Sequence, residues 1–111
     1  MDKTPLAKEV AHLFRVTGHK VDVSVEINHS EIDVRAEETQ GLVRKVILVE
    51  CADYGRPVGI RKMREDLNKL EAARELLKHN AVLMHVSRNG YSKNASGFAL
   101  DNGAPFFLSS R

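Results

Sequence analysis

The amino-acid sequence predicts a single α/β domain in which a mixed β-sheet is flanked by helices. Hydrophobic residues recur at helical spacing over about residues 5–17 and 60–77, and they alternate with polar residues over 20–27. The uninterrupted apolar run over 46–49 is typical of a central strand that is buried on both faces. With 111 residues, 42% of them hydrophobic, the chain suits one compact domain over 1–111.

The first half of the chain predicts a helix followed by a β-hairpin. Thr4 offers an N-cap hydroxyl, Pro5 suits the first helical position and Gly18 suits the end, so a helix is expected over 5–17. After a strand over 20–27, a short turn leads into a second strand, which predicts an antiparallel hairpin. The second strand is expected to carry Ile32, Val34 and Ala36 on one face and Glu31, Asp33 and Arg35 on the other.

The second half predicts a central strand, a long helix and further strands that are parallel to the central one. A third strand is expected over 42–53, and a loop over 54–59 leads to the helix. The apolar stripe of this helix is expected to comprise Ile60, Met63, Leu67, Leu70, Ala73 and Leu77. A strand over 81–87, a short helix over 92–100 and a last strand over 105–109 complete the order α-β-β-β-α-β-α-β.

Composition narrows the class of protein. The net charge is only +2, so charge alone does not indicate a nucleic-acid-binding protein. The single cysteine, Cys51, cannot form an internal disulfide, which favours a cytoplasmic location, and no apolar stretch approaches the ~20 residues that span a bilayer. The sequence ends directly after an apolar segment, as expected of the N-terminal part of a longer protein.

Two carboxylates on adjacent predicted strands suggest a metal site. Asp33 lies on the second strand and Glu50 on the third, and neighbouring strands are ~4.8 Å apart. Carboxylates this close repel each other, and Mg²⁺ or Mn²⁺ with oxygen ligands relieves the repulsion. The backbone carbonyl of Cys51 is a candidate further ligand. The alternative is that Asp33 faces solvent and that Glu50 pairs with a nearby arginine.

Several segments resemble the PD-(D/E)xK restriction-endonuclease superfamily, and its Mrr-like branch in particular. They are Glu31-Ile32-Asp33-Val34, the strand that ends in Glu50-Cys51-Ala52, the loop Arg56-Pro57-Val58-Gly59, and the segment over 86–95. Their order and spacing over about 5–109 are more specific than any single motif. The resemblance implies the α-β-β-β-α-β core of restriction-endonuclease-like nucleases.

The resemblance also implies roles for individual residues. Asp33 and Glu50 would bind the metal, and Glu9 on the first helix matches an acidic position that completes or supports the site. A solvated place on the helix face is the alternative for Glu9. The family's lysine, which positions the attacking water or stabilises charge, is expected two residues after the glutamate, where this chain has Ala52.

Ala52 puts catalysis in doubt, because alanine supplies no charge, proton or hydrogen bond. Loss of one group that stabilises developing charge costs ~10²–10³ in rate. Three explanations stay open: an engineered substitution of lysine by alanine, a natural cleavage-dead DNA-binding domain, or transfer of the lysine's role to Lys8, Lys45 or Lys62. The first is favoured, since the other features of the family stand intact.

Basic residues after the third strand suggest contacts with DNA. Arg56, Lys62 and Arg88 come from a loop, a helix start and a strand end that follow the carboxylates, and such positions suit backbone phosphates. A solvated helix face is the alternative, since Glu65, Asp66, Glu71 and Glu75 balance much of this charge.

The sequence therefore predicts a Mg²⁺-dependent DNA endonuclease domain that is cleavage-impaired as written. Double-stranded DNA is the expected partner, a homodimer stays open, and no membrane association is expected. The family analogy suggests an effector domain of a bacterial antiviral defence protein. One alternative is a non-catalytic nucleic-acid-binding or dimerisation module on the same fold, and another is a Holliday-junction resolvase-like enzyme.

Overall fold

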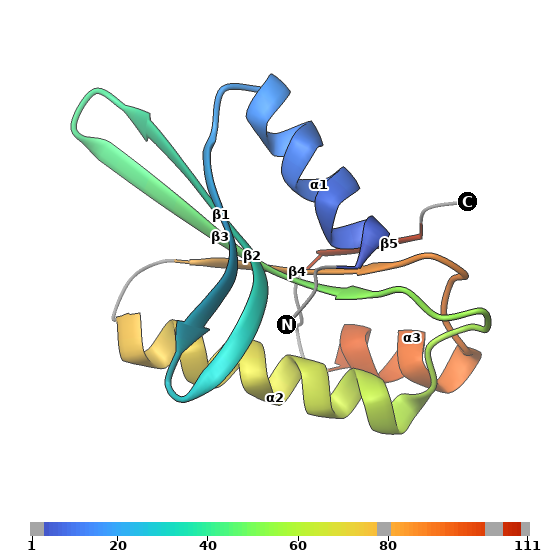
Figure 1. The fold of residues 1–111 in the computed structure, drawn as a ribbon. Helices are drawn as coiled ribbons and strands as arrows, with labels where there is room; N and C mark the ends of the chain where they lie inside the picture. Colours follow the sequence, from blue (N-terminus) through green and yellow to red (C-terminus); the bar gives the residue numbers. More distant parts are fainter. Residues whose placement is uncertain (1–3, 78–80, 102–105, 110–111) are drawn as a thin grey trace.

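Helices and strands follow one another in the order that the sequence predicts (Figure 1). The structure, a computed structural model, describes residues 4–77, 81–101 and 106–109. The elements are α1 (Pro5–Val16), β1 (Lys20–Ile27), β2 (Ser30–Gln40), β3 (Val43–Ala52), α2 (Ile60–Leu77), β4 (Val82–Ser87), α3 (Lys93–Asp101) and β5 (Phe106–Ser109).

The strands form one mixed sheet in the order β1-β2-β3-β4-β5. β1, β2 and β3 pair antiparallel as a meander, whereas β3, β4 and β5 pair parallel. The connections explain the change of direction, because a tight turn joins β1 to β2 whereas α2 crosses over between β3 and β4. β3 is therefore a central strand, and its residues 46–49 are buried on both faces as predicted.

Helices cover both faces of the sheet (Figure 1): α1 packs on one face, and α2 packs on the other with α3 beside it. An apolar cluster lies under each layer. The α1 cluster comprises Leu6, Ala7, Val10, Ala11, Val34, Ala36, Ile47, Val49 and Val86. The α2 cluster comprises Ile27, Ile32, Val46, Leu48, Ala52, Val58, Met63, Leu67, Leu70, Ala73, Ala81, Leu83, Ala95 and Ala99.

The β1–β2 hairpin passes from one layer to the other. Val23 and its partner Val34 pack with the α1 cluster, whereas Val25 and its partner Ile32 pack with the α2 cluster. Ser24 lies between the two valines with φ 53, a left-handed conformation that twists the strand sharply. The predicted alternation in β2 is confirmed in burial, since Ile32, Val34 and Ala36 are buried, but Ile32 contacts a different cluster from Val34 and Ala36.

Local signals fix the ends of α1 and the hairpin turn. Thr4 Oγ1 accepts a hydrogen bond from the Ala7 amide at 3.2 Å, which confirms the predicted N-cap. Asn28 and His29 have φ 55 and 62, the left-handed pair that a two-residue hairpin turn requires. Gly18 has φ 88 just beyond the end of α1.

Most of the predicted stripe of α2 is buried. Met63, Leu67, Leu70 and Ala73 are buried, but Ile60 is 37% exposed because it opens the helix beside an exposed loop. In the described part of the chain, no helix is both long and apolar enough to span a membrane.

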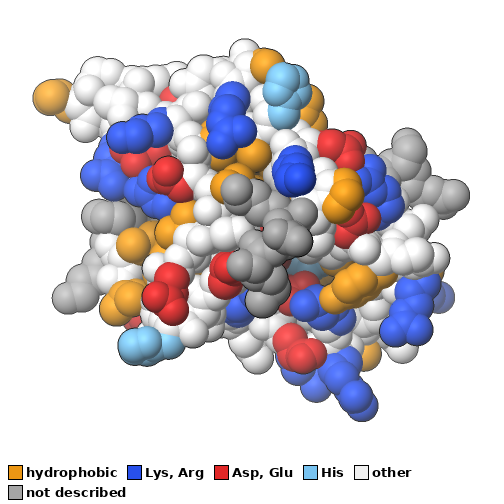
Figure 2. All heavy atoms as spheres, viewed as in Figure 1, with side chains coloured by type: hydrophobic (Ala, Val, Ile, Leu, Met, Phe, Trp, Pro, Cys, Tyr) orange, Lys and Arg blue, Asp and Glu red, His pale blue; other side chains and the backbone are white. Residues whose placement is uncertain are grey.

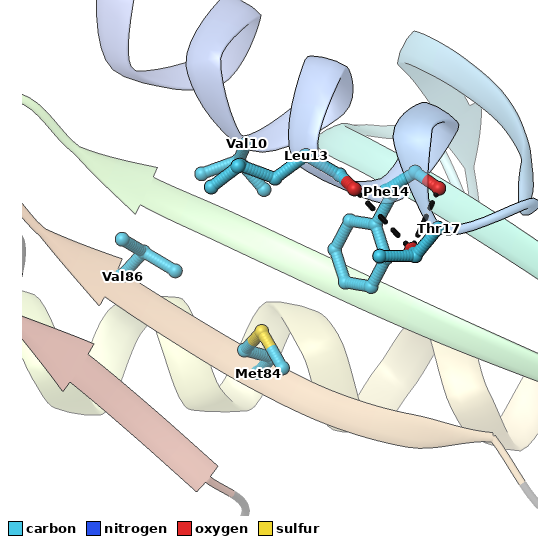
Figure 3. Close-up of a pocket in the computed structure, with 6 residues that line it drawn as sticks. All are labelled: Val10, Leu13, Phe14, Thr17, Met84 and Val86. Carbon is cyan, nitrogen blue, oxygen red and sulfur yellow. Dashed lines mark hydrogen bonds between the residues drawn. The ribbon is translucent and has the colours of Figure 1, made fainter.

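An apolar groove of about 240 Å³ separates α1 from β4 (Figure 3). Its lining comprises Val10, Leu13, Phe14, Thr17, Met84 and Val86. The Thr17 hydroxyl donates to the Leu13 and Phe14 carbonyls, at 3.2 and 2.9 Å, and so turns back onto its own helix. These residues bring no charge to the groove, so it offers no acid–base or metal chemistry.

The packing of α2 can be tested with Leu70→Ala. Leu70 is fully buried in the α2 cluster, so its truncation should lower the free energy of unfolding by about 2–5 kcal/mol. Leu76→Ala is the matched control on the same helix, because Leu76 is 55% exposed and its truncation should change this free energy by less than about 0.5 kcal/mol. Urea denaturation followed by circular dichroism measures both. Equal losses would contradict the observed packing.

Candidate active site

Strand register brings Asp33 and Glu50 together at the point where β2 and β3 stop pairing. The last residues that pair between these strands are Val34 and Val49, and Asp33 and Glu50 each lie one residue beyond them. The two acidic residues therefore face each other across the end of the ladder, on two strands that are direct neighbours in the sheet.

Side chains replace the backbone hydrogen bonds at this junction. Glu50 Oε1 accepts from the Asp33 amide at 3.1 Å, and Asp33 Oδ2 accepts from the Cys51 amide at 2.8 Å. Each carboxylate thus satisfies a main-chain donor of the opposite strand, which would otherwise be left without a partner where the ladder ends. These reciprocal contacts hold both acidic groups at one place.

Glu50 is buried and carries an unusually basic carboxylate. It is only 3% exposed, and its Oε2 lies 2.7 Å from Lys69 Nζ, which comes from α2. Burial, reinforced by repulsion from Asp33, raises the pKa of Glu50 to about 7 even though the Lys69 ammonium opposes the shift. The site therefore holds more negative charge than the surrounding protein neutralises.

Asp33 and Cys51 are affected by the same burial. Burial raises the pKa of Asp33 above its ordinary value, although the hydrogen bond from the Cys51 amide and the charge of Lys69 oppose this. Cys51 packs against the α1 cluster, on the face opposite to Glu50, and burial followed by the charge of Asp33 raises the pKa of its thiol. A thiol in this setting stays protonated and is not a nucleophile.

The donor set at this junction fits a hard divalent cation. Two carboxylates with raised pKa values supply oxygen ligands and excess negative charge, and Mg²⁺ typically takes one or two carboxylates and keeps several waters. Across the described ranges, no three His, Cys, Asp or Glu side chains gather into a metal-binding group. A metal at this site would therefore depend on Asp33, Glu50, main-chain oxygen and water.

Ala52 lies in the apolar core and not in a polar site. It is 1% exposed and belongs to the α2 cluster, on the same side of β3 as Glu50. Ser87 is its neighbour on β4, and the Ala52 carbonyl accepts from the Arg88 amide at 3.0 Å. The space into which a lysine at position 52 would extend borders side chains of α2, including Met63 and Leu67.

The lysine that reaches the carboxylates is Lys69, which sequence analysis missed. Lys8 and Lys45 are exposed, and Lys62 pairs with Asp66 at 2.9 Å. No ion pair joins any of these three lysines to Asp33 or Glu50 among the residues that the structure describes. Only the fold brings Lys69 to β3, because nineteen positions and a loop separate it from Glu50.

A second buried polar group lies beside Glu50 on the same face of the sheet. His85 is the β4 partner of Glu50 and is fully buried, and its Nε2 lies 2.7 Å from Asp66 Oδ2. Burial acts to raise the pKa of Asp66, but hydrogen bonds from His85 and Lys62 outweigh it, so the pKa is lowered. The sequence feature that could have indicated this His85–Asp66 pair is Asp66, a charged residue on the apolar stripe between Met63 and Leu70.

Glu9 is not joined to the carboxylate pair. It forms an ion pair with Arg88, and the hydrogen bond from Arg88 lowers the pKa of Glu9. Arg88 Nε also lies 3.3 Å from Asp53 Oδ1, and Asp53 Oδ2 accepts from the Leu6 amide at 3.0 Å in the first turn of α1. This cluster ties α1 to the ends of β3 and β4.

The predicted basic residues differ in their availability. Arg56 is exposed in the loop after β3, beside a hollow of about 380 Å³ lined by Tyr54, Gly55 and Arg56. Lys62 and Arg88 are engaged by Asp66 and by Glu9 and Asp53, respectively. In the face shown in Figure 2, basic and acidic side chains are interspersed, so no broad positive patch covers it.

Comparison with known proteins agrees with this geometry. The restriction endonuclease model Mrr_cat matches residues 1–108, nearly the whole sequence. The chain belongs to this family. A search of curated proteins found no match.

Restriction-endonuclease-like structures share the fold of this Mrr_cat domain. A crystal structure of a protein of unknown function, AF1548, has a TM-score of 0.70 at 21% identity, and the match covers 92% of this chain and 55% of AF1548. A repair endonuclease from Pyrococcus abyssi has a TM-score of 0.67 at 17% identity, and the match covers 100% of this chain and 49% of the endonuclease. EndoMS, solved with double-stranded DNA, has a TM-score of 0.64 at 14% identity, and the match covers 98% of this chain and 46% of EndoMS. The chain thus spans about half the length of these proteins.

The raised pKa of Glu50 predicts that the metal-free domain loses stability as pH rises. Because the folded state holds a proton on Glu50 up to about pH 7, whereas an unfolded glutamate loses it near 4.5, the folded state binds more protons between these values. The free energy of unfolding should therefore fall between about pH 5 and 7.5. The carboxyl groups of Glu9, Glu37 and Asp66 have lowered pKa values, so their effect on the free energy of unfolding falls at pH values below this window.

Urea denaturation in EDTA across this pH range measures the effect. Glu50→Gln, which keeps the shape of the side chain and removes its titration, should flatten most of the decline. An unchanged slope in Glu50→Gln would show that the decline has another origin.

Proposed function

We propose that this domain is a Mg²⁺-dependent DNA endonuclease that hydrolyses phosphodiester bonds at Asp33 and Glu50. The observation that carries the proposal is the meeting of two mutually repelling carboxylates, the buried Glu50 and the half-buried Asp33, where β2 and β3 separate. Membership of a restriction endonuclease family and the nuclease fold support the reaction class.

Asp33 and Glu50, with the Cys51 carbonyl, would hold Mg²⁺ or Mn²⁺. The bound cation would provide Lewis-acid activation of water and neutralise charge on the phosphodiester. The protein's contribution is orientation, since hydrogen bonds to the opposite strand fix both carboxylates. β3 brings no ammonium group to the site because position 52 is alanine, so cleavage is impaired unless another lysine supplies that charge.

DNA would lie across the loop that follows β3. Arg56 is exposed there, and Lys62 and Arg88 flank the same end of the sheet. We assign contact with backbone phosphates to Arg56 first, because Lys62 and Arg88 must exchange existing carboxylate partners before they bind DNA. Double-stranded DNA is the proposed substrate, in keeping with the DNA complex of EndoMS.

The setting of this activity is also a proposal. Mrr-like nucleases suggest an effector role in bacterial antiviral defence, in the cytoplasm, with further domains in the same polypeptide. The chain spans about half of its structural neighbours, which supports such additional domains. A homodimer would allow one cut in each strand of a duplex.

The second candidate is a non-catalytic DNA-binding or dimerisation module on the same fold. Ala52 favours it, because position 52 is apolar and buried where the family pattern has lysine. Metal binding separates the two functions, since a non-catalytic module has no need of a cation.

Calorimetric titration with Mg²⁺ and Mn²⁺ tests the proposed metal site. The unmodified chain should bind one cation, and Asp33→Asn or Glu50→Gln should weaken binding at least tenfold because each removes a charged ligand. Asp22→Asn is the matched control, an exposed carboxylate on β1 whose loss should leave binding unchanged. If none of these proteins binds either cation, the endonuclease proposal fails and the non-catalytic module is favoured.

Arg56→Gln tests the proposed DNA contact. Affinity for a short duplex should fall to a similar degree for all sequences, and the slope of log affinity against log salt should decrease by about 1, because one phosphate contact is lost. Fluorescence anisotropy in Ca²⁺ measures both quantities. Arg15→Gln, which removes an exposed arginine from α1, is the control and should keep the unmodified slope. Identical losses for the two variants would argue against a site beside β3.

A further inference from the structure

Position 52 has no ammonium group, but α2 places one beside Glu50. Lys69 Nζ lies 2.7 Å from Glu50 Oε2, and the Lys69 charge also acts on Asp33. One lysine on α2 is therefore in range of both carboxylates. We infer that Lys69 takes over the role of the lysine absent at position 52, so that Ala52 does not by itself disarm the site. This inference rests on the proposed endonuclease function.

The direction of approach supports this assignment. Ala52 belongs to the α2 cluster, so a side chain at position 52 and one from α2 approach Glu50 from the same side of the sheet. The Lys69 side chain is 29% exposed while its Nζ lies beside the buried Glu50, so the side chain spans the border between solvent and the carboxylate. A substrate phosphate could reach that border, whereas a group enclosed in the core would be inaccessible.

Position 52 itself is apolar and buried. Ala52 is 1% exposed and belongs to the α2 cluster with Val58, Met63 and Leu67. A lysine at this position would have to extend its alkyl chain along apolar side chains before its ammonium group reached Glu50. Lys69 lies nine residues after the start of α2 and reaches the same carboxylate from the helix.

The neighbouring lysine on α2 does not compete for this role. Lys62 is paired with Asp66 at 2.9 Å, and Asp66 is held in turn by His85 at 2.7 Å. Within the described residues, α2 is therefore joined to the sheet by two separate charged pairs, Lys69 with Glu50 and Asp66 with His85, and the first contains the predicted metal ligand. The inference selects the third explanation for Ala52, with Lys69 in place of the lysines proposed from sequence.

Relocating the ammonium group tests the inference. In Lys69→Met the side chain keeps its length and loses its charge, and cleavage of a duplex in Mg²⁺ should fall by about 10²–10³. Calorimetric Mg²⁺ affinity should be retained or rise, since a competing cation has been removed. Lys69→Arg should keep part of the activity. The double variant Ala52→Lys/Lys69→Met returns a lysine from the strand and should recover cleavage.

The matched control is Lys20→Met, an exposed lysine at the start of β1, which should cleave like the unmodified chain. Near-normal cleavage by a folded Lys69→Met protein overturns the inference and leaves the endonuclease proposal standing. An unmodified chain that binds metal without cutting, combined with a cutting Ala52→Lys variant, also overturns it. If neither binds metal, the endonuclease proposal itself fails. If Lys69→Met does not fold, Lys69→Arg still decides, because complete loss of cleavage in a folded Lys69→Arg protein that binds Mg²⁺ contradicts the expectation that a positive charge at position 69 keeps part of the activity.

Discussion

The site depends on a pair of reciprocal hydrogen bonds, here called the brace, between β2 and β3 at the point where the two strands separate. Glu50 accepts from the Asp33 amide and Asp33 accepts from the Cys51 amide, so two acidic side chains do what backbone carbonyls do elsewhere in the ladder. The brace fixes both carboxylates without any ligand, and burial raises the pKa of each. The proposed cation site is thus assembled by the same contacts that end the β2–β3 pairing.

Much of the fold could be predicted from the sequence because its signals are local. The Thr4-Pro5 start of α1, the short turn after β1 and the apolar run in β3 each act within a few residues. Asp33 and Glu50 could be placed on adjacent strands because meander neighbours usually pair. Their roles as metal ligands stay predictions, as does the role of the Cys51 carbonyl.

The remainder of the site depends on contacts that sequence spacing does not encode. Lys69 meets Glu50, and Asp66 meets His85, only because α2 packs across β3 and β4. The contact of Ile32 with the α2 cluster, where Val34 joins the α1 cluster, likewise depends on the twist of the hairpin and not on spacing. The pairing of Glu9 with Arg88 is also a product of the fold, and a supporting role of Glu9 in the site stays a prediction.

The crossing hairpin also has a consequence for cooperativity. Because β1 and β2 contribute to the hydrophobic clusters on both faces of the sheet, neither layer can open while the other stays intact. A subglobal opening that exposed Asp33 would uncover Val23 and Val34 on one side and Val25 and Ile32 on the other. The hairpin and the sheet are therefore expected to form one foldon, whose amides exchange with solvent only on nearly complete unfolding. The carboxylate pair is thus expected to be held rigidly, so that ion or substrate selectivity at the proposed site would come from a preformed shape.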